Sequence, residues 1–253
     1  MKVTFLGTGT SQGVPVIACP CIVCQSTDPR DKRLRSSIMI EDSGRTYIID
    51  TGPDFRCQML RENVKQLDAV IFTHEHKDHI AGLDDIRAFN YFLKKKIDVY
   101  ATERVQEAIH REFAYIFQKV KYPGVPEINL FTINQEPFRI HSTVFIPIEV
   151  KHHQLPVLGF RIEDFTYITD ANSISEKEKK KITGSKVLVL NALRKEEHIS
   201  HFTIDQAIAL AQELKIEKAY FTHISHQLGL HNEVEKELPD AIALAYDGLQ
   251  LEF

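Results

Sequence analysis

Three histidines and one aspartate lie within six residues, at His74, His76, Asp78 and His79. Neutral imidazole and carboxylate are ligands that suit zinc, manganese or iron. The apolar run Asp68–Phe72 before them predicts a buried strand, so the group follows a strand end on a rigid scaffold. Along an extended chain His74 and His76 point to the same side, whereas Asp78 and His79 are placed to face a second centre. The segment therefore predicts ligands for two metal ions; its alternative is a histidine-rich surface loop.

A second group of metal-binding side chains lies near the N-terminus, where Cys19, Cys21 and Cys24 follow the spacing CxCxxC. Three thiolates can occupy three corners of a tetrahedral zinc ion. No fourth ligand lies beside them, which leaves Cys57 and a distant histidine as candidates. Three clustered cysteines out of four make a poor disulfide framework, and the alternative to zinc is a set of reduced thiols in an ordinary loop.

Further candidates come at the ends of other predicted strands. Asp50 follows one strand and is placed to orient a histidine of the 74–79 segment. His152 and His153 follow another strand, and only one of them is expected to reach a metal, because neighbouring side chains of an extended chain diverge. If the strand ends converge, a sheet-based scaffold gathers a dinuclear site along one edge. The residues at strand ends are Asp50, His74, His76, His152, Asp170 and His223.

The elements that must position these residues are short strands in two batches separated by helices. Strands are expected at Lys2–Leu6, Ser36–Glu41, Arg45–Ile49, Asp68–Phe72, Ile97–Ala101, Phe138–Ile140, Thr143–Val150, Leu158–Ile162, Phe165–Thr169, Lys186–Asn191 and Ala219–Thr222. Helices are expected at 54–64, from within Ile80–Leu83 to Leu93, at Glu103–Phe117 and at Ile204–Leu214, with a loop at 118–135. No linker or repeat divides the chain, which predicts a single domain over residues 1–253.

The composition is that of an ordinary globular protein, with 253 residues, of which 43% are hydrophobic and 26% charged. The net charge of −4 gives no general attraction to nucleic acid or to an anionic membrane, so neither is expected as a partner. Glycines at positions 7, 9 and 13 interrupt the N-terminal segment too early for a signal peptide. No run of about 18 apolar residues exists. These features predict a cytoplasmic location.

The histidine-rich motif and the later strand-end residues together resemble the metallo-β-lactamase superfamily. The resemblance implies an α+β fold, the αββα sandwich, with two mixed β-sheets and helices on their outer faces. The segment from His152 to Phe160 resembles the family's third-histidine segment, which favours His152 over His153. The implied ligand sets are His74, His76 and His152 for one ion, Asp78, His79 and His223 for the second, and Asp170 as the bridge.

A narrower resemblance is to the PhnP-like phosphodiesterases of bacterial phosphonate breakdown. It rests on the loop Gly7–Gly9, the CxCxxC cysteines and His226, which comes three residues after the last expected active-site histidine. This resemblance implies that His226 is the fourth ligand of a structural zinc ion held by Cys19, Cys21 and Cys24. It also implies a homodimer.

These features predict a hydrolase in which two divalent ions, manganese, zinc or iron, hold a hydroxide that attacks a small, including a cyclic, phosphodiester. The leaving oxygen needs a proton, which a histidine can supply. His201 is the expected donor, from its resemblance to a family phosphodiesterase histidine, and His198 is the second candidate. Asp78 is expected to serve catalysis as well as metal binding.

Three other functions use parts of the same pattern. A thioester, lactone or β-lactam hydrolase keeps the site and changes the bond that is cleaved. RNA processing of the RNase Z type, at the 3′ end of tRNA, is disfavoured by the acidic balance and by the lack of an evident basic arm. A non-enzymatic metal-binding protein predicts about one tightly bound zinc ion per chain, whereas the hydrolase predicts about three ions.

Overall fold

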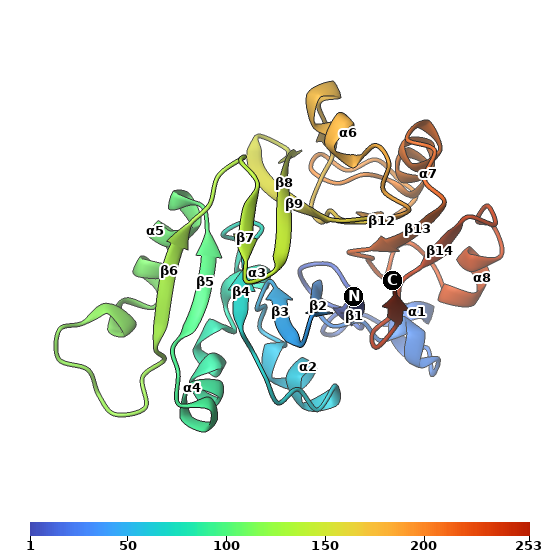
Figure 1. Ribbon diagram of the computed structural model, residues 1–253. Helices are drawn as coiled ribbons and strands as arrows, with labels where there is room; N and C mark the ends of the chain where they lie inside the picture. Colours follow the sequence, from blue (N-terminus) through green and yellow to red (C-terminus); the bar gives the residue numbers. More distant parts are fainter. The chain divides into compact units, whose positions relative to one another are not determined.

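The computed structural model describes all residues from Met1 to Phe253 and divides into two compact units. Each unit contains one β-sheet, and its elements are labelled in chain order in Figure 1. Both units are built from segments that are not adjacent in the sequence. The first comprises Met1–Leu6, Ser37–Asn134 and Gln250–Phe253, and the second comprises Gly7–Ser36 and Gln135–Leu249.

A seven-stranded mixed sheet forms the centre of the first unit. Strands β3 to β6 run parallel, while β15 pairs antiparallel with β1, and β2 with β3. Ile49 of β3 pairs with Ile71 of β4, so Asp50 and Thr73 follow neighbouring strand ends. The strands in sheet order are β15 (Gln250–Glu252), β1 (Lys2–Gly7), β2 (Ser37–Asp42), β3 (Arg45–Ile49), β4 (Ala69–Ile71), β5 (Ile97–Ala101) and β6 (Ile128–Thr132).

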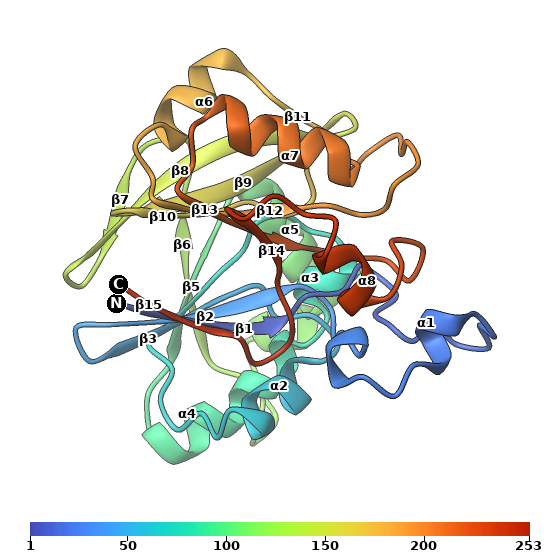
Figure 2. The ribbon, with the colours of Figure 1, turned by 90° about the vertical axis from the view of Figure 1, so that its right-hand side faces the viewer.

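Helices pack on one face of this sheet. Val70 and Val99 of the central strands share a buried core with Phe55, Phe89 and Ile109, which lie on three different helices. Figure 2 shows α2 and α4 along the same face. The helices are α2 (Phe55–Arg61), α3 (Lys77–Ile80), α4 (Arg87–Leu93) and α5 (Glu103–Glu112), with 3₁₀ turns η2 (Leu83–Ile86) and η3 (Ala114–Phe117).

The second unit is built on an eight-stranded mixed sheet. Strands β7 to β10 and β11 pair antiparallel, whereas β10, β12, β13 and β14 run parallel. The parallel strands share one carboxyl edge, and Asp170, Asn191 and His223 all follow or end strands there. The strands are β7 (Phe138–Ile140), β8 (Thr143–His152), β9 (Leu155–Ile162), β10 (Phe165–Tyr167), β11 (Ser173–Ile174), β12 (Val187–Asn191), β13 (Lys218–Thr222) and β14 (Ile242–Leu244).

Helices α6 and α7 lie along one face of the second sheet (Figure 2). Ile182 of α6 and Ala207 of α7 share a core with Leu190 and Phe221 of the strands. Helix α7 begins at a capping box, in which the side chains of Thr203 and Gln206 satisfy each other's backbone N–H groups. The helices are α1 (Ile22–Gln25), α6 (Glu176–Ile182), α7 (Ile204–Glu213) and α8 (His231–Glu235), with the 3₁₀ turn η1 (Pro29–Asp31).

The prediction of two mixed sheets with helices packed on them is confirmed. One local prediction was wrong. The predicted loop at 118–135 contains β6 (Ile128–Thr132), whose mostly exposed side chains give no clear apolar alternation. The helix expected to run to Leu93 is present as the 3₁₀ turn η2 (Leu83–Ile86) followed by α4 (Arg87–Leu93), and the separate short helix α3 (Lys77–Ile80) precedes it, with His76 as the extended residue before its first turn. None of the helices is long and apolar enough to cross a membrane.

Candidate functional site

The segment that follows β4 carries four predicted ligands of the first unit. The rings of His74 and His76 lie with their centroids 4.6 Å apart, and those of His74 and His79 4.2 Å apart. Nε2 of His79 lies 3.3 Å from Oδ2 of Asp78. Two ligand atoms that share one ion at bond lengths of about 2.0–2.2 Å come about this close to each other. The donor set and its spacing therefore fit a divalent metal.

Asp50 fixes the orientation of this segment. Its carboxylate accepts hydrogen bonds from the backbone N–H of Thr73 at 2.9 Å and from the Thr73 hydroxyl at 2.8 Å, and Nδ1 of His79 lies 2.7 Å away. Complete burial raises the pKa of Asp50, while the contacts with His79 and Thr73 act in the opposite direction. Asp50 therefore contacts a histidine of the segment, and its role in orienting that histidine for a metal stays a prediction.

The same network sets the tautomer of two histidines. Because the Thr73 hydroxyl donates its proton to Asp50, its oxygen accepts from Nδ1 of His74, 3.0 Å away. His79 donates from Nδ1 to Asp50 directly. Both rings then present Nε2 as the atom that can coordinate a metal, an arrangement typical of metal-ligating histidines.

Backbone contacts hold helix α3 against the turn that carries Asp50. Thr51 donates its N–H to the carbonyl of His79 at 2.8 Å, and Gly82 donates to the carbonyl of Thr51 at 2.8 Å. A Cβ atom at Gly82 would lie 2.1 Å from the carbonyl oxygen of Gly52. Glycine at position 82 is therefore what permits this close approach.

The second unit brings a carboxylate and three histidines together at the ends of its strands. Nδ1 of His223 lies 2.9 Å from Oδ1 of Asp170, which also accepts a 2.7 Å hydrogen bond from the hydroxyl of Thr169. Ring centroids of His201 and His223 lie 4.8 Å apart, and those of His152 and His201 4.5 Å apart. Ligand atoms of His152, Asp170 and His201 all lie within 4.8 Å of one another. This set also fits a divalent ion.

His152 and His153 have different environments. His152 is buried, and its Nδ1 donates to the carbonyl of Ser200 at 2.8 Å, so Nε2 is again the atom that can bind a metal. His153 is exposed and has a positive φ of 58°. The structure thus places His152, and not His153, beside Asp170.

His201, the expected proton donor, lies beside the predicted ligands His152 and Asp170. Its Nε2 is 3.7 Å from Oδ2 of Asp170. Its Nδ1 is 3.1 Å from both the hydroxyl of Ser200 and Nδ1 of His198. Burial, and secondarily the nearby His201, lowers the pKa of His198. The geometry of His201 suits a proton donor and a metal ligand equally.

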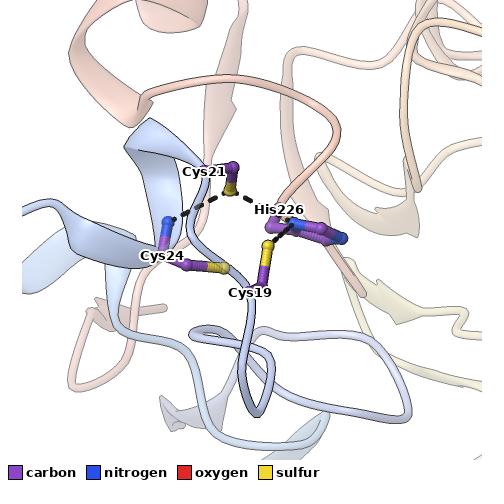
Figure 3. A group of neighbouring side chains, drawn as sticks. All are labelled: Cys19, Cys21, Cys24 and His226. Carbon is purple, nitrogen blue, oxygen red and sulfur yellow. Dashed lines mark hydrogen bonds between the residues drawn. The ribbon is translucent and has the colours of Figure 1, made fainter.

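Three cysteines and His226 meet within the second unit (Figure 3). The Sγ atoms of Cys19 and Cys21 each lie 3.3 Å from Nδ1 of His226, although the residues are more than 200 positions apart. A tetrahedral zinc ion holds sulfur and nitrogen ligands about 3.5 Å apart, so the set fits zinc. Cys57 is exposed on α2 and does not belong to the set.

Within this thiol cluster of Cys19, Cys21, Cys24 and His226, two of the thiols differ in their electrostatic environment. The hydrogen bond with His226 lowers the pKa of Cys21 to about 6, whereas burial raises the pKa of Cys24 to about 11. A metal ion binds the thiolate form, so it would take the proton from Cys24 on binding.

Several residues that support these groups carried no recognisable signal in the sequence. Thr73 connects His74 to Asp50, and Ser200 contacts both His152 and His201. Asn191 exchanges two hydrogen bonds with the backbone of Ala171, the residue after Asp170. These residues support the site through contacts between segments that are distant in the sequence. Only Asn191 could have been suspected beforehand, because it ends an apolar strand as several predicted ligands do.

Comparison with known families decides the affiliation of the chain. The family model described as a β-lactamase superfamily domain matches residues 45–224. This chain belongs to the metallo-β-lactamase superfamily. The predicted fold class, the αββα sandwich of that superfamily, is confirmed by this membership.

Individual relatives of this superfamily member carry different names. A solved structure titled as a new diphosphatase from the PhnP family is 40% identical, covers 100% of this chain and 97% of its own, and superposes with a TM-score of 0.93. The octanoyltransferase of Porphyromonas gingivalis is 39% identical across 99% of this chain but is covered over only 51% of its length. The ribonuclease Z of Staphylococcus epidermidis is 27% identical across 64% of this chain and 49% of its own.

The chain spans about half the length of the curated relatives that it matches. Relatives named ribonuclease Z also mean that the exclusion of nucleic acid as a partner, drawn from net charge, is not supported. Net charge averages over the whole surface, so it does not report a local binding site.

Replacing Asp50 with asparagine tests its role in orienting ligands. We expect metal affinity to fall about 10- to 100-fold, because an amide cannot accept all the hydrogen bonds that fix His74 and His79. The measurement is a calorimetric titration of the metal-free protein with manganese or zinc. Asp164→Asn, which changes an exposed carboxylate paired with Lys186, serves as the control. Equal affinity in Asp50→Asn and the control would remove this role.

Replacing His226 with alanine tests the thiol cluster as a structural zinc site. We expect the loss of about one zinc ion per chain and a Tm lower by roughly 10 °C, because zinc binding contributes directly to folding. The measurements are elemental analysis and thermal unfolding. The control is Cys57→Ser, an exposed thiol outside the cluster, which should keep both values. An unchanged zinc content in His226→Ala would contradict the assignment.

Proposed function

We propose that this chain is a hydrolase that cleaves a phosphodiester or diphosphate bond in a small substrate. The observation that carries the proposal is the similarity to the PhnP-family diphosphatase, at 40% identity over nearly the whole of both chains. Because 97% of the diphosphatase chain is matched, the residues responsible for its named activity lie within the match. The octanoyltransferase is covered over only 51% of its length, so its name describes a protein with about as much chain again outside the match.

The metal centre that we propose follows the superfamily resemblance, and it has support within each unit. His74, His79 and His152 all use Nδ1 as a hydrogen-bond donor, which leaves Nε2 for coordination. Two divalent ions, manganese, zinc or iron, would supply a water of lowered pKa and positive charge for the phosphoryl oxygens. The proposed ligands are His74, His76 and His152 for one ion, Asp78, His79 and His223 for the other, with Asp170 as the bridge.

We assign to His201 the proton that the leaving oxygen needs. When the Ser200 hydroxyl donates to Nδ1 of His201, the ring proton sits on Nε2, the atom that faces Asp170. A proton held at Nε2 can be transferred to an oxygen that departs from phosphorus. His198 touches the same Nδ1 and stays the second candidate. The zinc at Cys19, Cys21, Cys24 and His226 is assigned a structural role, because four protein ligands leave no open position.

A second candidate function is hydrolysis of an acyl thioester. It is favoured by the octanoyltransferase of Porphyromonas gingivalis, which matches 99% of this chain at 39% identity. The same metal pair could polarise a thioester carbonyl in place of a phosphoryl oxygen. Cleavage of RNA is the third candidate, from the relatives named ribonuclease Z.

A substrate panel separates these candidates. The purified chain is stripped of metal, reloaded with manganese or zinc, and supplied with a bis-aryl phosphate, a cyclic nucleotide, a dinucleoside diphosphate, an octanoyl thioester and a β-lactam. We expect metal-dependent turnover of the phosphorus compounds and little of the carbonyl compounds. Turnover confined to the thioester would overturn the proposal in favour of the second candidate.

Replacing His201 with alanine tests its role. We expect kcat on the phosphodiester to fall about 10²- to 10⁴-fold, because a general acid contributes a factor of this size. Metal content should stay unchanged, and the loss should be smaller for a substrate whose leaving group needs no proton. The control is His110→Ala, an exposed histidine of α5. Loss of a metal ion in His201→Ala would instead make His201 a ligand.

A further inference from the structure

A cationic pocket lies in the first unit, away from the strand ends that carry the predicted ligands. It has a volume of about 560 Å³ and is formed by helix α4, the Lys94–Lys96 turn that follows it, and the end of the loop of residues 118–127. Figure 1 shows that loop beside the C-terminal end of α4. We call this feature the Lys94–Lys96 pocket.

The walls of the Lys94–Lys96 pocket are tied together by one side chain. The amide of Asn90 donates to the carbonyls of Lys95 at 3.0 Å and of Glu127 at 2.8 Å, and it accepts from the N–H of Glu127 at 2.9 Å. Lys94 ends α4 in the left-handed region, with φ of 54°. Asn90 thus joins segments 37 residues apart and fixes the backbone around the pocket.

The charge of the pocket is only partly neutralised. Lys95 is paired with Asp68 at 3.0 Å, and Arg87 with Asp84 at 3.1 Å. Lys94 and Lys96 make no ion pair, and both are exposed. Glu127 is the one carboxylate in the lining, against four cationic side chains. In a chain with a net charge of −4, this is a local positive surface.

The aromatic ring of Tyr91 lines the pocket, and Phe92 and Tyr122 are exposed on the segments that adjoin it. Tyr91 is 67% exposed, Phe92 is 78% exposed, and their centroids lie 5.1 Å apart. Nζ of Lys94 lies 4.2 Å from the centre of the Tyr91 ring. The loop of residues 118–127 adds Tyr122, which is 81% exposed, and the unpaired, exposed cations Lys119 and Lys121. Large rings held in water beside cations are typical of a binding surface and not of a solvated turn.

We propose that the Lys94–Lys96 pocket and the adjoining loop bind a single-stranded nucleic acid. Lysine ammonium groups would contact the phosphates, and exposed rings would stack on bases that a duplex keeps inside. An acidic peptide would use the cations but would leave the exposed ring of Tyr91, which lies beside Lys94, without a role. The proposal goes beyond the proposed function, and it holds whichever bond the metal centre cleaves.

Fluorescence anisotropy with labelled single strands of RNA and DNA of about 12 nucleotides tests the proposal. The double variant Lys94→Glu/Lys96→Glu should bind at least about tenfold more weakly, with a shallower dependence of affinity on salt, because two phosphate contacts are lost. Tyr91→Ala should weaken binding about 5- to 100-fold without changing the salt dependence, because it removes stacking alone. Turnover of a small phosphodiester should be unchanged in both.

The control is Lys177→Glu/Lys180→Glu, which makes the same charge change on exposed positions of α6. It should bind like the unmodified chain; an equal loss in both double variants would show a response to net charge alone and overturn the proposal. Absence of binding by the unmodified chain, or equal competition by poly-glutamate, would also overturn it. Lys94→Gln/Lys96→Gln replaces the Glu variant if thermal unfolding shows that the latter is destabilised.

Discussion

The buried carboxylate of Asp50 is the group on which the order of the first unit's ligands depends. It accepts hydrogen bonds from Thr73 and His79 directly, and it is connected to His74 through the Thr73 hydroxyl. A buried carboxylate requires such partners, and the histidines require a fixed tautomer, so each side of the network satisfies the other. The contact of Gly82 with the same turn adds a backbone restraint. The hydrogen bonds of Asp50 therefore fix the tautomer and the orientation of the predicted ligands His74 and His79.

Three of the residues that the sequence placed at strand ends have a strained backbone. Asp50, Asp170 and His223 all follow strands and all have positive φ, between 52° and 66°. A residue other than glycine in this region costs free energy, about 1 kcal/mol or more, which surrounding contacts must offset. For Asp170 those contacts include the paired hydrogen bonds between Asn191 and Ala171.

The N-terminal part of the second unit depends on a different interaction. Its apolar cluster is small, with Val14, Val23 and Cys24 as the fully buried members, and α1 spans only four residues. Such a segment buries too little apolar surface to order itself, and a metal can replace the missing core. Zinc held by three thiolates and His226 would connect this segment to the residues after β13. We therefore expect the thiol cluster, with zinc bound, to stabilise the fold of the N-terminal segment.

The sequence determined which donors occur together and roughly where strands end, because side-chain type and short spacing are local properties. His74, His76, Asp78 and His79 were recognisable in this way, as were most strands and the superfamily. Tertiary structure decided what depends on pairing between distant segments: the proximity of His201 to Asp170, the network around Asp50, and the hydrogen bonds between Asn90 and Glu127. The sequence did not predict strand β6, because its mostly exposed side chains show no apolar alternation. The net charge gave no sign of the positive surface around Lys94–Lys96, because it sums over the whole chain. Contacts between residues far apart in the chain leave no pattern in a single sequence.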